Sequence, residues 1–342
     1  MIGIAVIGYG YWGPNLARSF SEVDGCRVVA VVDASAAALA GVAKRHPAAR
    51  LLTQWREALA DPAVDAVVIA TPVSSHHEIA MAALRAGRHV LVEKPMTVTA
   101  AEARTLVDEA ARRALVLMVG HTFVYSSAVR RMRELVDADA LGQIYYYDST
   151  RINLGLFRRD VNVVWDLAIH DLSILQYLFA GQPLAVSAHG VSHVLGNPEN
   201  MAQVTLYYEA GMIAHLNVNW LAPVKVRQVL LGGSKKMIVY DDLQPSDKLK
   251  IYDRGLTLGN EPDELRQLLV NYRMGDMWSP QLSTTEPLLV EAEHFVDCIR
   301  TSATPVTDGR LGCSVVEILE AASQSMRRRG HPVEMMPLRA AG

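Results

Sequence analysis

Two short stretches of the sequence combine charged and ionisable side chains in patterns that suit proton transfer. The first is Glu93-Lys94-Pro95, which follows an apolar run. A lysine in a binding site can hold a substrate hydroxyl by a charge-assisted hydrogen bond and stabilise negative charge that develops on its oxygen. The same lysine could instead lie in solvent and pair with Glu93, and its position alone does not separate the two interpretations.

The second stretch runs from Asp166 to His170, near the start of an expected helix. Side chains four residues apart share one helical face, so this carboxylate and imidazole are expected to lie together. A histidine beside a carboxylate can accept a proton near neutral pH. Alternatively, Asp166 is only an N-terminal carboxylate that is stabilised by the positive end of the helix dipole, and His170 is a core residue with its hydrogen bonds satisfied. Asp171 is expected to cap or support the helix, and the spacing supplies no further ligands for a zinc ion.

A glycine-rich loop near the N-terminus has the spacing G-x-G-x-x-G, between an apolar run and an expected helix. In this arrangement the first glycine allows a tight turn, the second lets a pyrophosphate approach the backbone, and the third lets helix and strand pack closely. The helix N-terminus then presents unpaired N–H groups to the phosphates. The candidate cofactor-binding residues of the loop are Gly8, Tyr9, Gly10, Tyr11, Trp12 and Gly13.

An acidic residue follows this loop at the distance that is typical of dinucleotide-binding folds. Asp33 lies about 20 residues after Gly13, at the end of the second apolar run. A carboxylate there accepts hydrogen bonds from the adenosine ribose and repels a 2′-phosphate, and Ala34–Ala36 offers no arginine to bind one. We therefore expect NAD as the cofactor, and no metal. Residues that follow later strands are expected to complete the cofactor site: Thr71, Pro72, His76, Glu93 and Lys94.

The first third of the chain alternates short apolar runs with amphipathic stretches. The expected strands are Ile2–Ile7, Val28–Val32, Ala66–Ala70, His89–Val92 and Val116–Val119, and the expected helices are Asn15–Val23, Ala34–Arg45, His77–Ala86 and Ala101–Ala114. This alternation predicts an α/β fold of the Rossmann type, with a doubly wound parallel sheet. Ligands of such sheets bind beyond the carboxyl ends of the strands, where Lys94 is expected.

The pattern changes in the rest of the chain. Apolar residues alternate with polar ones along Ile213–Trp220, and a turn connects this stretch to Met201–Tyr208, which indicates antiparallel strands. Further expected elements are a strand at Ile144–Ile152 and helices at Trp165–Phe179, Leu288–Arg300 and Val315–Arg329. We predict an NAD-binding domain over residues 1–122 and an α+β domain over residues 123–342, with a large, mainly antiparallel open sheet.

Composition excludes several other classes of protein. The 342 residues are 50% hydrophobic and 20% charged, with a net charge of −3, so a folded core is expected and a nucleic-acid or anionic-membrane partner is not. The three cysteines have no metal-ligand spacing and suit a reducing compartment. No apolar stretch is long enough to cross a membrane, and no signal peptide is recognisable, so we expect a cytoplasmic protein.

Together these motifs resemble the Gfo/Idh/MocA family of oxidoreductases over nearly the whole chain. The matching pieces are the Gly8–Gly13 loop, the segment from Ala70 to His76, Glu93-Lys94-Pro95 and the Asp166–His170 pair. In that family the lysine and the Asp/His pair surround the carbon that exchanges a hydride. The resemblance therefore implies that Lys94, Asp166 and His170 are the catalytic residues. Many members have glycine where this chain has Ala168.

Three other segments look like the nucleotide-sugar branch of the family: Gly120–Tyr125, Arg151–Gly155 and Val163–Leu167. This implies NAD-dependent oxidation of a secondary hydroxyl, at C3 of a sugar such as UDP-N-acetylglucosamine or UDP-glucose, to a keto sugar for later amination in amino-sugar or antibiotic biosynthesis. It also implies a homo-oligomer formed through the second-domain sheet. The expected substrate-binding residues are Lys94, His121, Tyr125, Arg151, Asn153, Arg158, Arg159 and His170, although the arginines could also lie in a solvated loop.

Other functions fit the same motifs. The enzyme could run as an NAD(P)H-dependent reductase of a keto-sugar nucleotide, although Asp33 disfavours NADPH, or it could oxidise a free sugar or inositol. A cofactor-binding regulator without turnover is a further alternative. The sequence leaves open the sugar, the nucleotide, the carbon that is oxidised, the oligomer count, and whether Lys94 or His170 accepts the proton.

Overall fold

The computed structural model describes residues 1–155, 161–179, 181–253, 255–257, 271–273 and 275–335. The chain divides into two compact units. The first contains Met1–Ser126 and Thr284–Glu320, and the second contains Ser127–Ser283 and the segment that starts at Ala321. The sequence analysis places one boundary between residues 122 and 123, whereas the structure returns residues 284–320 to the first unit. None of the described helices is both long and apolar enough to span a membrane.

The first unit is built on a six-stranded sheet in the order β3-β2-β1-β4-β5-β6, in which every neighbouring pair is parallel. The strands are β1 (Ile2–Ile7), β2 (Cys26–Val32), β3 (Arg50–Leu52), β4 (Ala66–Ile69), β5 (His89–Glu93) and β6 (Leu117–Gly120). The central strands are buried on both faces, which explains their continuous apolar sequences. This sheet confirms the predicted Rossmann-type class. Its register aligns Ile7 with Val32 and Ile69, and Glu93 with Gly120, so the carboxyl ends meet at one edge.

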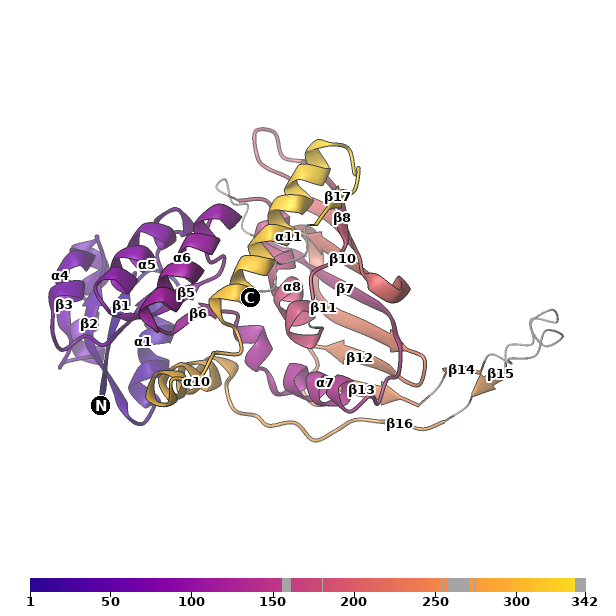
Figure 1. Cartoon of the computed structure of the whole chain (residues 1–342), viewed down its shortest axis with the longest axis horizontal. Coiled ribbons are helices and arrows are strands. Elements are labelled where there is room, and N and C mark those ends of the chain that lie inside the picture. Colours follow the sequence, from indigo (N-terminus) through magenta and orange to yellow (C-terminus); the bar gives the residue numbers. More distant parts are fainter. Residues whose placement is uncertain (156–160, 180, 254, 258–270, 274, 336–342) are drawn as a thin grey trace. The chain divides into compact units, whose positions relative to one another are not determined.

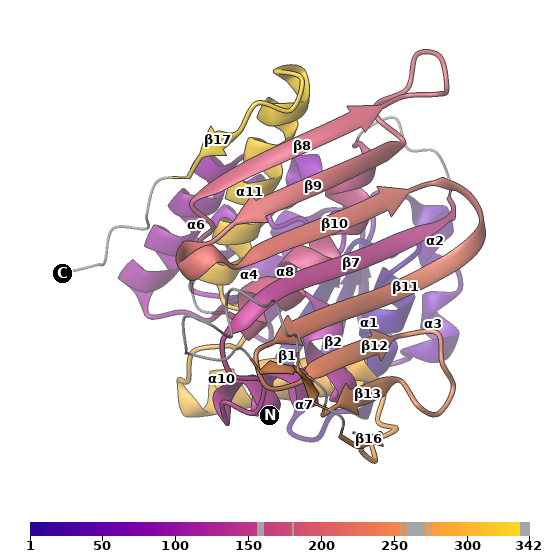
Figure 2. The ribbon, with the colours of Figure 1, turned by 90° about the vertical axis from the view of Figure 1, so that its right-hand side faces the viewer.

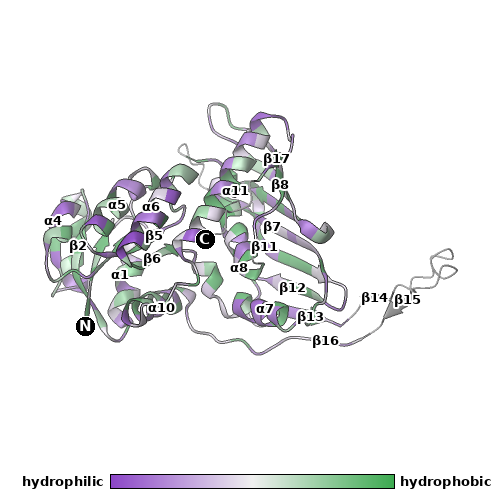
Figure 3. Cartoon of the chain, viewed as in Figure 1, coloured by the Kyte–Doolittle hydropathy of each residue, from purple (hydrophilic) through white to green (hydrophobic). Residues whose placement is uncertain are grey.

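Helices cover both faces of this sheet (Figure 1). They are α1 (Gly13–Glu22), α2 (Ala36–Leu39), α3 (Val42–Arg45), α4 (Trp55–Ala60), α5 (His76–Arg85), α6 (Ala100–Arg113), α10 (Pro287–Thr301) and the first part of α11 (Gly309–Arg327). Each longer helix turns an apolar side inward, as in α6, where Ala103, Leu106 and Ala110 are buried and polar residues lie opposite (Figure 3). The helix expected over Ala34–Arg45 is two short helices, α2 and α3, separated by Ala40 and Gly41.

The second unit is built on a nine-stranded sheet in the order β16-β13-β12-β11-β7-β10-β9-β8-β17 (Figure 2). Only β7 and β10 pair in parallel, and the other seven pairs are antiparallel, as expected for a mainly antiparallel open sheet. The strands are β7 (Ile144–Leu154), β8 (Ala185–Val191), β9 (Met201–Tyr207), β10 (Ile213–Asn219), β11 (Leu221–Gly233), β12 (Met237–Asp241), β13 (Leu249–Tyr252), β16 (Met277–Trp278) and β17 (Val333–Glu334).

One face of this sheet forms the core of the second unit. Along β10 the residues Ala214, Leu216 and Val218 are at most 1% exposed, whereas His215 between them is exposed. The helices α7 (Ser127–Asp137), α8 (Ile169–Leu178) and the end of α11 lie behind the sheet in the view of Figure 2. The alternation along Ile213–Trp220 therefore predicted both the strand and its buried face correctly.

Candidate active site

The glycine-rich loop joins β1 to α1, and its three glycines have different surroundings. Gly8 has a φ of +96°, and a Cβ there would lie 2.6 Å from the carbonyl oxygen of Ala70. A Cβ on Gly13 would overlap the carbonyl oxygen of Gly8. Both positions therefore need glycine for the fold itself. Gly10 instead has nothing within 4 Å of where its Cβ would be, so the backbone there faces open space, as a pyrophosphate site requires.

The start of α1 can also accept an anion. Trp12 precedes the helix, Pro14 lies in its first turn, and this turn contains no acidic residue. Because a proline lacks an N–H group, it costs no hydrogen bond at this position. Tyr11 is 93% exposed, whereas Tyr9 is 7% exposed and belongs to the core. The backbone of the loop at Gly10 and the ring of Tyr11 are therefore accessible to a dinucleotide.

Asp33 connects the end of β2 to the glycine loop. Its Oδ2 accepts a hydrogen bond of 2.7 Å from the backbone N–H of Tyr9, and its Oδ1 accepts one of 2.8 Å from Ser35. A carboxylate can accept more than one hydrogen bond on each oxygen, so both remain able to bind ribose hydroxyls. Asp33 therefore lies where the sequence predicts it, and it also holds the loop in place, which the motif did not reveal.

His76 is the first residue of α5 and lies beneath the carboxyl ends of β4 and β5. It is 1% exposed, and its Nδ1 and Nε2 lie 2.8 Å from the carbonyl oxygens of Pro95 and Thr71 respectively. Burial lowers the pKa of His76, and the hydrogen bonds to these carbonyls oppose this effect. The imidazole therefore ties together two loops at the edge of the sheet. It supports the loop of Thr71 and Pro72, where the ribose is expected, and each of its ring nitrogens faces a carbonyl oxygen.

Glu93 and Lys94 follow directly at the end of β5. Both residues are half-buried, and the backbone N–H of Lys94 lies 3.2 Å from Oε2 of Glu93, to which it donates. Burial raises the pKa of Glu93 to about 7, although the charge of Lys94 and a hydrogen bond from the Trp12 side chain counter the rise. The segment thus places a lysine and a carboxyl group with a raised pKa at the carboxyl edge of the sheet, where ligands of this fold bind.

The structure adds a residue that the sequence analysis missed, the carboxyl group of Glu291 on α10. Glu291 is 1% exposed, and its Oε2 accepts a hydrogen bond of 2.8 Å from the Thr122 hydroxyl. Burial raises the pKa of Glu291 well above its usual range, and the charge of Glu93 raises it further. The sequence gives no sign that Glu291 is a buried carboxyl group bonded to Thr122. It is a single glutamate inside an amphipathic helix, and Thr122 is 169 residues away.

His121 and Tyr125, which were expected to bind substrate, are core residues of the first unit. Their exposed fractions are 1% and 2%, and the hydroxyl of Tyr125 lies 3.0 Å from that of Thr307. Burial lowers the pKa of His121 to about 3, and the charge of Lys94 adds to this shift, so the imidazole is neutral near pH 7. The burial of both side chains argues against direct contact with a sugar.

In the second unit, Asp166 and His170 lie on either side of a change in helix type. Residues Val164–Ala168 form a π turn, and His170 is in the first turn of α8. Such π turns occur often at functional sites. The indole Nε1 of Trp220 donates a hydrogen bond of 3.0 Å to Oδ2 of Asp166. The expected helix over Trp165–Phe179 is therefore present, but its first turn is widened around the candidate carboxylate.

Arg151, expected to clamp a phosphate, is instead paired inside the second unit. Its Nε and one terminal nitrogen donate to the two carboxylate oxygens of Asp171 at 2.8 and 2.9 Å. Arg151 and Asp171 are 3% and 2% exposed. This corrects the expectation for Arg151, because a buried bidentate pair fixes α8 to strand β7 and takes up the face of the guanidinium that would bind a phosphate. The supporting role expected for Asp171 agrees with this contact.

Asn153 lies at the end of β7, near the residues that hold Asp166. A Cβ on Gly155 would be 2.8 Å from Cδ1 of Trp220 and 3.4 Å from Nδ2 of Asn153. The amide of Asn153, the indole of Trp220 and the carboxylate of Asp166 thus gather around the end of this strand. Trp220 was expected only as a core residue of the sheet. Two other candidates, Arg158 and Arg159, lie outside the described residues.

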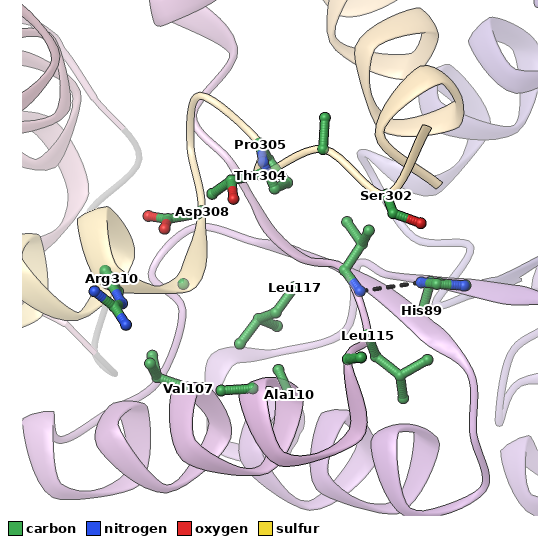
Figure 4. A pocket seen from close by; sticks show the side chains of 15 residues that line it. His89, Val107, Ala110, Leu115, Leu117, Ser302, Thr304, Pro305, Asp308 and Arg310 are labelled. Atoms are coloured by element: carbon green, nitrogen blue, oxygen red, sulfur yellow. Dashed lines mark hydrogen bonds between the residues drawn. The ribbon is translucent and has the colours of Figure 1, made fainter. Parts of the chain in front are cut away.

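A cavity of about 330 Å³ in the first unit lies elsewhere (Figure 4). It is bounded by α6 and by the segment from Ser302 to Arg310, beside His89 and Leu117. Because His89 begins β5 and Leu117 begins β6, the cavity is at the amino edge of the sheet. The glycine loop and Lys94 are at the carboxyl edge, so this cavity is not the cofactor site. In the described part of the chain, no group of three or more His, Cys, Asp or Glu residues is arranged to hold a metal ion.

Comparisons with known proteins match both units of the chain. A family model described as "Oxidoreductase family, NAD-binding Rossmann fold" matches residues 2–121, and one described as "GFO/IDH/MocA C-terminal domain" matches residues 129–239. The chain belongs to the Gfo/Idh/MocA family. It is accordingly an oxidoreductase with an NAD-binding Rossmann domain, as the motifs predicted.

Dehydrogenases named for different substrates, and a protein of gentamicin A biosynthesis, resemble the chain over most of its length. UDP-N-acetylglucosamine 3-dehydrogenase of Acidithiobacillus ferrooxidans is 29% identical over 91% of this chain and 93% of its own. Its solved structure aligns with a TM-score of 0.80, over 96% of this chain and 98% of its own. The scyllo-inositol 2-dehydrogenase (NAD(+)) of Bacillus subtilis is 24% identical over 99% of this chain and 96% of its own. The crystal structure of GenD2 from gentamicin A biosynthesis, in complex with NAD, has a TM-score of 0.82 at 26% identity, with 98% and 96% covered.

Proposed function

We propose that this oxidoreductase uses NAD to oxidise a secondary hydroxyl of a nucleotide sugar, at C3 of a UDP-hexose. The observation that carries the proposal is the similarity to UDP-N-acetylglucosamine 3-dehydrogenase, which extends through both units at 29% identity. The product would be a 3-keto sugar, which suits a following transamination. The similarity to GenD2, from gentamicin A biosynthesis, supports a place among amino-sugar or aminoglycoside pathways.

NAD fits the residues of the first unit better than NADP does. Gly10 leaves open space for a pyrophosphate, and Asp33 places a carboxylate at the end of β2, beside exposed Ala34–Ala36. That carboxylate would accept hydrogen bonds from the adenosine ribose and repel a 2′-phosphate. When bound, NAD supplies the hydride acceptor, and the protein supplies positioning and proton transfer.

Lys94, Asp166 and His170 would act on the same substrate hydroxyl. In this proposal His170 takes the hydroxyl proton, and Lys94 holds the oxygen as negative charge develops on it. Asp166 stabilises the imidazolium form of His170 and is itself fixed by the indole of Trp220. Lys94 could instead accept the proton, with His170 holding the oxygen. The pH dependence of kcat in variants at Lys94 and at His170 tests which of the two is the proton acceptor.

A nucleotide diphosphate would need cationic or polar side chains to bind its phosphates. With Arg151 paired to Asp171, the candidates for the diphosphate are Asn153 and the arginines Arg158 and Arg159. Oxidation of a free sugar or inositol stays the second candidate, because the scyllo-inositol dehydrogenase of Bacillus subtilis matches 99% of this chain.

The test is a comparison of substrates with purified protein. NADH formation is followed by absorbance with UDP-N-acetylglucosamine, UDP-glucose, scyllo-inositol, myo-inositol and glucose, each with NAD and with NADP. We expect turnover with a UDP-sugar and NAD, and a product with a keto group at C3 by NMR. Turnover with inositol or glucose alone would overturn the nucleotide-sugar assignment. Faster turnover with NADP would overturn the cofactor assignment, and a preference for reducing a keto-sugar nucleotide would overturn the proposed direction of the reaction.

A further inference from the structure

Trp220 lies between β10 and β11 and connects three segments of the second unit. Its backbone N–H donates a hydrogen bond of 2.9 Å to the carbonyl oxygen of Asn200, and its own carbonyl oxygen accepts one of 3.0 Å from the N–H of Gly155. Its indole Nε1 donates the bond of 3.0 Å to Oδ2 of Asp166. The side chain is 1% exposed. Both backbone groups of Trp220 are therefore fixed, and the indole reaches the candidate carboxylate from inside the core.

Asp166 is held from its own side by the same loop between β8 and β9 that holds Trp220. The carbonyl oxygen of Glu199 accepts a hydrogen bond of 2.9 Å from the backbone of Val163, and its carboxylate accepts one of 3.2 Å from the amide of Asn162. The backbone N–H of Asp166 in turn donates to the carbonyl oxygen of Asn162 at 3.2 Å. Two adjacent residues of one loop thus fix both the donor and the acceptor of the indole hydrogen bond.

Gly155 leaves the space that the indole needs. A Cβ at this position would lie 2.8 Å from Cδ1 and 3.1 Å from Cγ of Trp220. Cδ1 is the ring atom bonded to Nε1, so a side chain at residue 155 would press on the edge of the ring that carries the N–H group. Because the ring is packed inside the core, pressure there would displace the donor relative to Asp166. A hydrogen bond weakens steeply when donor and acceptor lose their alignment.

We propose that Trp220 is a positioning residue for the hydride-transfer reaction, in which its indole fixes the orientation of the Asp166 carboxylate and Gly155 keeps the indole in place. The inference rests on the part that Asp166 takes in the proposed function. A hydrogen bond to an ionised carboxylate is stronger than one between neutral groups. A carboxylate fixed in this way needs no reorientation when positive charge develops on the imidazole of His170.

The direct test is ¹H–¹⁵N NMR of the full chain with labelled tryptophan, without cofactor or substrate. The five tryptophans give five indole signals, and Trp220→Phe identifies one of them. We expect this signal to move upfield in Asp166→Ala, which removes its acceptor, and to move in Gly155→Ala, which displaces the ring. The signal of Trp165, whose indole donates to the hydroxyl of Ser323, is the internal control and should stay in place. If Trp220→Phe does not fold, replacement of the other four tryptophans one at a time assigns the signal by elimination.

Kinetics separate a positioning role from simple packing of the core. Trp220→Phe should lower kcat by about 10- to 100-fold and leave the KM for NAD unchanged, since displacement of a reacting group by about 1 Å can cost about 100-fold. In an Asp166→Ala background the same replacement should lower kcat by less than about twofold, because Trp220 acts through Asp166. Trp165→Phe also removes a hydrogen-bonded indole of this unit and is the matched control, with kcat near that of the wild type.

The proposal is overturned if the indole signal of Trp220 stays in place in Asp166→Ala. It is equally overturned if Trp220→Phe lowers kcat by the same factor with and without Asp166, because a purely structural role would act in both backgrounds. Full kcat in Asp166→Ala would overturn this proposal together with the proposed role of Asp166. A failure of UDP-sugars as substrates would leave it in place, since the kinetics can use whichever sugar is turned over and the NMR test needs none.

Discussion

The acidic residues of the candidate sites are each held by a donor from a distant part of the chain. Asp33 accepts from the backbone of Tyr9, and Asp166 accepts from the indole of Trp220. Such contacts fix the orientation of a carboxylate before any ligand arrives, which lowers the free-energy cost of binding in the correct geometry. The chemistry of each site therefore depends on single hydrogen bonds that can be tested one at a time.

Replacement of Lys94 tests its part in the chemical step. We expect Lys94→Ala to lower kcat by about 10²- to 10⁴-fold, the usual contribution of a group that assists proton transfer. NAD binding, measured by fluorescence titration, should change little, because the glycine loop and Asp33 are untouched. Lys44→Ala removes an exposed lysine of the same unit and is the matched control. Equal losses of activity in both variants, or full activity in Lys94→Ala, would contradict the assignment.

His121 should make the protein sensitive to acid. Its pKa is 6.5 in the unfolded chain and about 3 in the folded protein, because burial disfavours the charged imidazole. As the pH falls below 6.5, the unfolded state takes up a proton that the folded state does not, so stability is lost. Between pH 6.5 and 5 this amounts to about 2 kcal/mol of the free energy of unfolding.

Chemical denaturation at several pH values checks this effect. His121→Leu removes the titrating group, so its free energy of unfolding should fall by about 2 kcal/mol less than that of the wild type over this range. The buried His76 and the half-buried His89 are present in both proteins and cancel in the difference. His193→Gln, at an exposed position, should behave as the wild type does. Parallel pH dependence in His121→Leu and the wild type would show that the pKa of His121 is the same in the folded and unfolded states, and would contradict the prediction.

At the scale of the structural elements, the glycines of the loop serve different purposes: Gly13 is required by the fold, and Gly10 is expected to be required by the ligand. A Cβ at Gly13 would overlap the backbone of Gly8, whereas a Cβ at Gly10 would meet nothing within 4 Å. We therefore expect Gly13→Ala to lower the melting temperature. Gly10→Ala should keep the melting temperature of the wild type and bind NAD more weakly, because the methyl group occupies the space for the pyrophosphate. Thermal unfolding with and without NAD measures both effects, and unchanged NAD affinity in Gly10→Ala would place the cofactor elsewhere.

The elements that the sequence predicted best are those whose burial is uniform. Strand β1 has the predicted bounds, Ile2–Ile7, because every residue after the first is buried and apolar. Strand β3 was missed, since Arg50–Leu52 is a three-residue edge strand in which only Leu52 is buried. The Ala34–Arg45 stretch was predicted as a single helix because its apolar spacing continues past Gly41, where the structure interrupts it. Short elements at an edge bury too little surface to leave a periodic pattern.

The candidate sites divide in the same way. Motifs with a fixed local spacing, such as the glycine loop and the Asp166–His170 pair, could be proposed as sites because a few neighbouring residues carry the signal. Arg151 could not be assigned correctly, because its partner Asp171 belongs to another element, and only the fold shows that they meet inside the core. Long-range pairing of this kind leaves no trace in residue spacing. Because Arg151 is paired with Asp171, it is not a candidate for binding the substrate.

At the scale of the whole molecule, the first unit is discontinuous in sequence. Residues 284–320 fold with residues 1–126, although the second unit separates them along the chain. Helix α10 packs against α1, where the rings of Phe20 and Phe295 meet edge to face with centroids 6.1 Å apart. Both rings are fully buried, so a chain that ends after residue 126 would expose Phe20 to solvent.

We therefore expect the fragment 1–126 to be much less stable than the first unit in the intact chain. Loss of α10 exposes the apolar side of α1 and removes Glu291 from Thr122. Exposure of one buried phenylalanine costs about 2 to 3 kcal/mol, and the remaining contacts of α10 with α1 and with Thr122 are lost as well, which is a large part of the total stability of a small domain. A chain that joins residues 1–126 to residues 284–320 by a flexible linker restores these contacts. It should unfold cooperatively by circular dichroism and bind NAD, whereas equal stability and NAD affinity in fragment 1–126 would show that the N-terminal segment is a complete domain without α10.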